Sequence, residues 1–212
     1  CGAEIGFLQA IDIRGLAELT KEYNVDIFVH RLAGEFMHPH SSLAHRGAVA
    51  KPEEFDEKIR ACFRVGHVRT FDDDPRFGFT VLSEVGSRAL SPGINDPGSA
   101  IHAIASLARL VHLCLKPRSP ESAPNHPRLY LRAITAAEIL DDAFRAIGRD
   151  AASMAEVSSM LQRALAALGA FPEFLEPAKE ISRENINHCR KAMDSEFDLA
   201  RVKASAGKLL EA

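Results

Sequence analysis

Apolar residues recur at helical spacing over most of the chain, from Pro52 to the C-terminus. Spacing of three and four residues places such side chains on one face of a helix, and each face needs a neighbour that buries it. The first fifty residues differ, because short apolar runs such as Ile5 to Ile11 are typical of strands. The pattern predicts an α+β fold that is mainly helical. We expect a small β-rich part over residues 1–50, followed by a helical bundle over residues 51–212.

Capping residues predict where several helices begin. Asp74-Pro75 and Asp96-Pro97 each place a carboxylate before a proline, and proline suits the first helical position. Thr135 with Glu138 three places later forms a capping box. The helix that starts at Asp96-Pro97 carries two adjoining apolar stripes up to about residue 115. We therefore expect that helix to be packed on most of its circumference, at the centre of the domain.

The charge balance excludes some classes of partner. Twenty-six Lys and Arg residues against 29 Asp and Glu residues give a net charge of −3, which leaves no electrostatic footprint for nucleic acid. The absence of Trp and the presence of two Tyr argue against a base-stacking platform. No apolar run approaches the ~20 residues of a bilayer-spanning helix, so the chain is expected to be a soluble domain.

The four cysteines lie far apart and form no Cys-x-x-Cys pair; they are Cys1, Cys62, Cys114 and Cys189. A disulfide framework is denser than this, whereas a thiol on a helix behaves as a small hydrophobe. We expect these residues to be reduced and buried, which favours a cytoplasmic location.

The most unusual stretch joins two predicted helices and reads Ser91-Pro92-Gly93-Ile94-Asn95-Asp96-Pro97. Proline and glycine force a tight connection, after which Asp96-Pro97 restarts the helix. Together with Arg88-Ala89-Leu90, Asp74-Pro75-Arg76-Phe77-Gly78 and the opening Gly6-Phe7-Leu8-Gln9, this run resembles the domain of unknown function 2254 family. The members are bacterial predicted membrane proteins. The resemblance covers Gly6 to Leu115, and Gly98 departs from it by standing where a bulkier residue is usual.

The resemblance implies a membrane location but no activity. Members of the family carry transmembrane helices, which would lie upstream of Cys1 and would be this domain's own partner. The soluble domain is then expected to be membrane-associated and to face the cytoplasm. No enzymatic reaction follows from the resemblance, and fold-level analogy does not supply one.

The connection between the two helices is also the candidate ligand site. A helix that begins at Asp96 presents backbone N–H groups, and polar side chains precede and follow it. The candidate ligand-binding residues are Arg88, Ser91, Asn95, Asp96 and His102. The alternative is a purely structural turn, since the Asp96 carboxylate would itself occupy the helix end.

Neither a metal nor a cofactor is expected. His30, His38, His40 and His45 lie within one stretch, but their spacing matches no compact metal motif, and solvated histidines explain them better. Residues 72–74 are three aspartates without EF-hand spacing, which helix capping and solvated loop charge explain.

Three functions remain open. The chain has no Gly-x-Ser-x-Gly elbow, P-loop, Gly-x-Gly-x-x-Gly or His-Glu-x-x-His motif, which favours a non-catalytic domain. The leading hypothesis is a ligand-sensing or regulatory domain of a bacterial membrane protein that binds a small molecule. The second is a hydrolase-like enzyme that uses Arg88, Asp96 and His102. The third is a structural domain whose amphipathic helices form a homo-oligomer.

Overall fold

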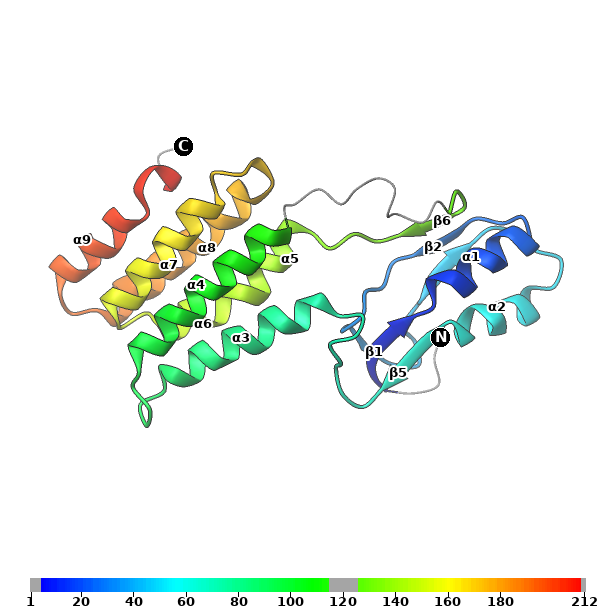
Figure 1. Cartoon of the computed structure of the whole chain (residues 1–212), viewed down its shortest axis with the longest axis horizontal. Coiled ribbons are helices and arrows are strands. Elements are labelled where there is room, and N and C mark those ends of the chain that lie inside the picture. The colour runs from blue at the N-terminus through cyan, green and yellow to red at the C-terminus, as the bar shows by residue number, and fades with distance from the viewer. Residues whose placement is uncertain (1–4, 115–125, 211–212) are drawn as a thin grey trace. The chain divides into compact units, whose positions relative to one another are not determined.

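The computed structural model describes residues 5–114 and 126–210, which form two compact units (Figure 1). The first unit comprises the described residues up to Gly78 and those from 126 to Ile134. The second comprises Phe79 to Cys114 and Thr135 onward. The predicted mainly helical α+β class is confirmed.

The first unit contains the strands of the described chain and two of its helices. In chain order these are β1 (Gly6–Ile11), α1 (Ile13–Glu22), β2 (Ile27–Val29), β3 (Phe36–Met37), β4 (Ala44–Arg46), α2 (Pro52–Ala61), β5 (Phe63–Gly66) and β6 (Leu129–Leu131). The strands form two three-stranded sheets, in the orders β3-β1-β5 and β4-β2-β6. In the second sheet, β2 pairs antiparallel with β4 and parallel with β6, so that Val29 lies opposite Leu131.

Side chains from both sheets and both helices make the core of this unit. Leu8 of β1, Ile27 of β2, Leu16 of α1 and Phe55 of α2 are each fully buried in one cluster. The first unit extends past the predicted boundary at residue 50, because α2, β5 and β6 complete its core and its sheets. β5 pairs with β1, and β6 pairs with β2, each across a long sequence separation. The local periodicity of a sequence does not predict pairing over such distances.

The second unit is helical throughout its described residues. Its elements are most of α3 (Pro75–Ala89), α4 (Pro97–Cys114), α5 (Ala136–Leu140), a π-helical turn η2 (Asp141–Arg145), α6 (Ala146–Asp150), α7 (Ala155–Leu168), α8 (Pro172–Ala192), α9 (Glu196–Ser205) and a 3₁₀ turn η3 (Gly207–Leu210). The predicted helix starts at Pro75 and Pro97 are confirmed. The capping box is confirmed as well, since Thr135 accepts from the Glu138 amide and the Glu138 side chain accepts from Thr135.

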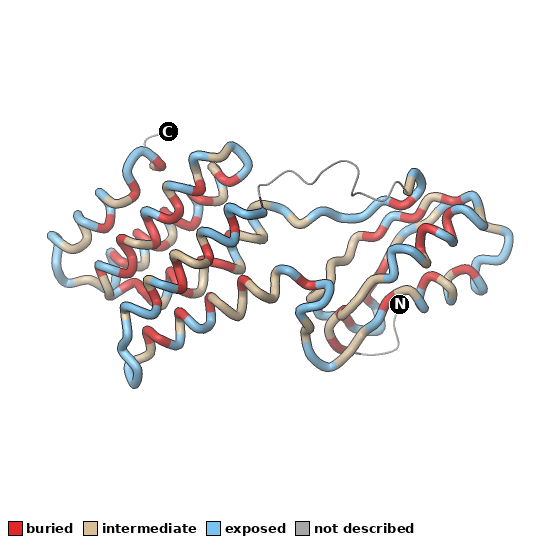
Figure 2. Tube along the Cα trace, viewed as in Figure 1, coloured by how far each residue is buried: buried red, intermediate tan, exposed pale blue. Residues whose placement is uncertain are grey.

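The central helix of this unit is α7, and the prediction that α4 is central was wrong. α7 packs against α4, α8 and α9, whereas Leu110 and Leu113 of α4 are 42% and 50% exposed. Figure 2 shows the buried residues of the helical unit gathered on facing sides of its helices. Two adjoining apolar stripes on α4 suggested burial around most of the helix, but its buried residues, which include Ile104 and Leu107, come from both stripes, and neither stripe is covered along its whole length.

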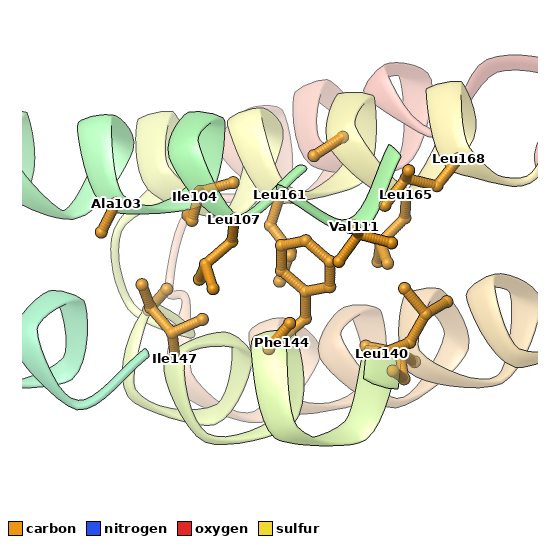
Figure 3. Packing of buried hydrophobic residues seen from close by; sticks show 14 of the residues in the cluster. Ala103, Ile104, Leu107, Val111, Leu140, Phe144, Ile147, Leu161, Leu165 and Leu168 are labelled. Atoms are coloured by element: carbon orange, nitrogen blue, oxygen red, sulfur yellow. The ribbon is translucent and has the colours of Figure 1, made fainter. Parts of the chain in front are cut away.

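A buried polar network joins α7 to α8 and α6. Gln162 is fully buried, accepts a hydrogen bond from Ser182 Oγ at 2.5 Å and donates to Asn185 Oδ1 at 2.8 Å. Asn185 in turn donates to the Gly148 carbonyl at 2.7 Å. Because these buried amides are hydrogen-bonded, the polar contact between α7 and α8 avoids the cost of unsatisfied groups. The surrounding apolar core includes the fully buried ring of Phe144 (Figure 3).

The described cysteines are free, and the expectation of burial holds for only one of them. Cys189 is fully buried, and burial raises the pKa of its thiol. Cys62 is half-buried, and Cys114 is exposed at the end of α4, beyond the last covered turn of that helix. Cys1 lies outside the described residues.

Candidate functional site

The signature connection between α3 and α4 is a turn closed by its own backbone. The amide of Asp96 donates to the Ala89 carbonyl at 2.8 Å, and the amide of Asn95 donates to the Ser91 carbonyl at 2.9 Å. Asn95 has φ = 50°, a left-handed conformation that asparagine tolerates better than most residues. The left-handed backbone gives Asn95 a clear structural purpose here.

The carboxylate of Asp96 caps α4. It accepts hydrogen bonds from the Ser99 amide at 3.0 Å and from the Ser99 hydroxyl at 2.6 Å. These bonds, with a smaller contribution from the charge of His102, hold the pKa of Asp96 below its usual value. The helix N-terminus is thus occupied by a carboxylate of the same chain, as the structural alternative predicted.

The five predicted site residues share one end of the helical unit without forming a closed site. Ser91 is half-buried and donates its hydroxyl to the Arg88 carbonyl at 2.7 Å. Arg88, Asn95, Asp96 and His102 are exposed. Among the described residues, no hydrogen bond joins the side chains of Arg88, Asn95 or His102 to one another. Ligand binding at this loop stays a prediction.

The cap has a pH-dependent consequence. Since the pKa of Asp96 is lowered in the folded chain, its stabilising contribution is present above the unfolded value of about 3.9 and is lost as the pH falls through the folded pKa. Asp96→Ala should lower the Tm at pH 7, and the difference from the wild type should shrink steadily below pH 4. Thermal melts between pH 7 and pH 2.5 measure this, with the exposed Asp194→Ala as control. A difference in Tm between Asp96→Ala and the wild type that does not change with pH would contradict the role of the Asp96 carboxylate as the cap.

The histidine and aspartate clusters of the first unit show no metal-binding geometry. His30 lies 4.6 Å from His45 between ring centres, and His38 lies 6.2 Å from His40. Within the described ranges, no three His, Cys, Asp or Glu side chains gather as ligands of one ion. Asp74 is buried, accepts from the Phe77 amide at 3.1 Å, and pairs with Arg69.

A partly open cavity of about 430 Å³ lies in the first unit, where β2 and β6 end. Its walls are mainly apolar, and its charged members are two arginines and one aspartate. The lining residues are Ile11, Ile13, Val29, Arg31, Leu32, Ala33, Asp73, Pro75, Leu131, Arg132 and Ile134. A concave, mostly apolar lining with a few polar groups is the usual composition of a small-molecule site.

Parallel pairing brings the two arginines to this cavity. β2 and β6 run in the same direction, so Arg31 and Arg132 follow neighbouring strand ends, and the Arg132 amide donates to the Val29 carbonyl at 3.0 Å. Glu35 lies between the guanidinium groups, 3.1 Å from Arg31 Nη1 and 2.6 Å from Arg132 Nη1. Arg31 Nε also donates to the Ser42 carbonyl at 2.7 Å. These bonds hold both cations in defined positions.

Sequence reasoning missed this group of residues. Glu35 and Arg132 are 97 positions apart, and the parallel pairing that joins them has no local signature. The pair of Arg31 and Glu35 was within reach of sequence reasoning, because these two residues and the Gly34 turn lie within five positions of one another. Gly34 has φ = 90°, which only glycine adopts readily, and a Cβ there would clash with the carboxylate of Asp74.

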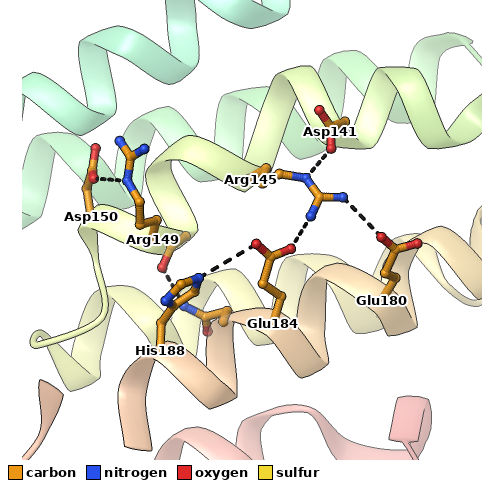
Figure 4. Close-up of polar contacts among 9 residues, drawn as sticks. Asp141, Arg145, Arg149, Asp150, Glu180, Glu184 and His188 are labelled. Atoms are coloured by element: carbon orange, nitrogen blue, oxygen red, sulfur yellow. Dashed lines mark hydrogen bonds and ion pairs between the residues drawn. The ribbon is translucent and has the colours of Figure 1, made fainter. Parts of the chain in front are cut away.

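A second charged cluster lies on the helical unit, around Arg145 at the end of the π turn (Figure 4). Its guanidinium donates to Asp141 on the same turn and to Glu184 and Glu180 on α8, the last at 3.2 Å. These bonds hold the pKa of Arg145 above its ordinary value. π turns occur often at functional sites. Here, however, each of the three guanidinium nitrogens donates to a carboxylate, so the cluster ties η2 to α8.

The described helices carry no candidate membrane span. No helix in residues 5–114 or 126–210 is both long enough and apolar enough to cross a bilayer.

The fold and the cavity define an α+β protein with a helical unit and a smaller β-containing unit that holds the candidate small-molecule site. The chain matches the family described as "Predicted membrane protein (DUF2254)" over residues 2–167, and it belongs to that family. The resemblance drawn from the signature is thereby confirmed. No solved structure matches the chain.

Curated relatives of this chain come from mycobacteria. An uncharacterised protein of Mycobacterium bovis and one of Mycobacterium tuberculosis H37Rv are each 29% identical to it over 108 residues. The matched region is 49% of this chain and 21% of each relative. A second M. tuberculosis strain, CDC 1551, has a relative that is 28% identical over the same length. The chain therefore spans about a fifth of the length of these relatives.

Proposed function

We propose that this chain is a non-catalytic ligand-sensing or regulatory domain of a bacterial membrane protein. The observation that supports this most is the cavity at the ends of β2 and β6, which combines apolar walls with two fixed guanidinium groups. Every lining residue falls within the region that matches the family. The membrane character of the family supports the attachment to a transmembrane part.

The composition of the cavity favours binding over catalysis. Its lining has no Ser, Cys, His or Lys side chain, and Asp73 is its one carboxylate. A hydrolase needs a nucleophile or an activated water beside a base, together with groups that stabilise the transition state. The hydrolase-like alternative at Arg88, Asp96 and His102 is weaker, because Asp96 is engaged by Ser99 as a helix cap.

The proposed partners follow from this function. A ligand that enters the cavity would contact the turn from Arg31 to Ala33, the end of β6 and the start of α3. Binding would shift the conformational equilibrium of these elements, and the domain would transmit this shift to the transmembrane segment of the same protein. We place the domain on the cytoplasmic side and expect it to act as a homo-oligomer, which native mass spectrometry tests directly.

Native mass spectrometry of the purified chain is the experiment that tests this function. A retained small molecule is expected, and it should be lost in Ala33→Leu, which fills the cavity. Ala48→Leu is the matched control, because Ala48 is exposed and lies outside the lining. A molecule that is instead lost in Arg88→Ala or Asn95→Ala would move the site to the signature loop. Retention of no molecule, in chain prepared under several mild conditions, would count against sensing and favour assembly.

A further inference from the structure

We infer that the cavity at the ends of β2 and β6 takes a small amphipathic monoanion, an aliphatic chain that carries one carboxylate. This inference rests on the proposed function and names the ligand class of the same site. Three features of the lining support it: two guanidinium groups, a set of aliphatic side chains, and a single acidic residue.

The guanidinium groups account for the anionic head. Arg31 and Arg132 both line the cavity, whereas Glu35, which holds them, does not. Arg31 engages Glu35 and Ser42 through Nη1 and Nε, and its Nη2 group makes no hydrogen bond to another described residue. A guanidinium has five N–H donors in a planar fork that matches a carboxylate. The head of a ligand can therefore bind without breaking the contacts to Glu35.

The walls account for the tail. The aliphatic lining comes from the end of β1, the start of α1, the end of β2 with the turn that follows it, and the end of β6 with the segment that follows it. Its branched members are Ile11, Ile13, Val29, Leu32, Leu131 and Ile134. A volume of about 430 Å³ lies near the lower end of the range for small-molecule sites, so it suits a medium-length chain better than a whole lipid. Each methylene buried there should raise the affinity about fourfold.

Asp73 sets the charge of the ligand. It is the one carboxylate in the lining, and it would repel a ligand with more than one negative charge. A phosphate or dicarboxylate is therefore a poorer match than a single carboxylate. Asp73→Asn is expected to tighten the binding of a monocarboxylate severalfold, since it removes this repulsion.

Isothermal titration with sodium octanoate, well below its micelle concentration, tests the inference. Acetate supplies the head alone and octan-1-ol supplies the tail alone, and each should bind at least tenfold more weakly than octanoate. Arg31→Gln should weaken octanoate at least tenfold, and Ala33→Leu should abolish its binding. Arg128→Gln is the control, because Arg128 is 44% exposed, pairs with Asp26 and lies outside the lining. Circular dichroism establishes that each variant is folded.

The outcomes separate the ligand class from the function. The inference is overturned if octanoate does not bind, if octanol binds equally well, or if Ala33→Leu retains the binding. If native mass spectrometry then finds a different molecule that Ala33→Leu releases, the ligand class is wrong and the sensing function stands. If no molecule is retained and octanoate does not bind, both are wrong.

Discussion

Phe144→Ala is expected to lower the free energy of unfolding of the helical unit by about 4 kcal/mol. Phe144 is fully buried on the π turn, in the same core cluster as Leu107, Leu161 and Leu165 (Figure 3). Truncation of a buried phenylalanine removes its transfer free energy and leaves a cavity that a close-packed core only partly fills. Chemical denaturation followed by far-UV circular dichroism measures the loss.

Phe197→Ala is the matched control for this change. It makes the same substitution in the same unit, but Phe197 is 76% exposed on α9. Its effect should stay below about 0.5 kcal/mol. Similar losses for the two variants would show that Phe144 does not lie in the core as described.

Asp74→Ala is expected to destabilise the first unit by about 3 kcal/mol. The Asp74 side chain is 1% exposed, and its carboxylate accepts hydrogen bonds from Arg69 Nε at 2.8 Å and from the Phe77 amide at 3.1 Å. Its removal leaves the Arg69 guanidinium without its buried partner and uncaps α3. The Arg69 side chain is 21% exposed, so water can partly solvate its charge once Asp74 is gone. The expected loss of unfolding free energy is therefore at the lower end of the range for breaking a buried ion pair.

Asp72→Ala provides the control, because Asp72 is exposed two residues earlier in the same acidic run. It should change the unfolding free energy by less than about 0.5 kcal/mol. Hydrogen exchange of the amides in α1 and β2 reports on the first unit separately from the helical one. Equal exchange in the Asp72 and Asp74 variants would mean that the ion pair contributes nothing to this unit.

Local chemistry in the sequence predicted the beginnings of helices well. Asp74-Pro75, Asp96-Pro97 and the Thr135–Glu138 capping box act through contacts within four residues, so the sequence alone carries the whole signal. The depth of burial of α4 was predicted wrongly, because the width of an apolar stripe does not say how many neighbours cover it. The neighbour count depends on tertiary packing, which placed α7 at the centre.

The candidate site shows the same division between local and distant information. The signature loop is conspicuous in the sequence because it contains proline, glycine and asparagine, and the structure explains Asn95 by its left-handed backbone and Asp96 by helix capping. The cavity is inconspicuous because Arg31 and Arg132 come together only through the parallel pairing of β2 with β6. The signature loop and the candidate binding cavity therefore belong to different units of the chain.

The parallel pairing of β2 with β6 also sets an order of events during synthesis. Residues up to Gly78 leave the ribosome before residues 129–131, so one edge of β2 stays unpaired until α3 and α4 have been made. Until then that edge offers unpaired backbone groups to any neighbouring chain. A fragment that ends at residue 78 is thus expected to aggregate, and the smallest part of this chain that can complete the sheet must include the helices inserted between its strands.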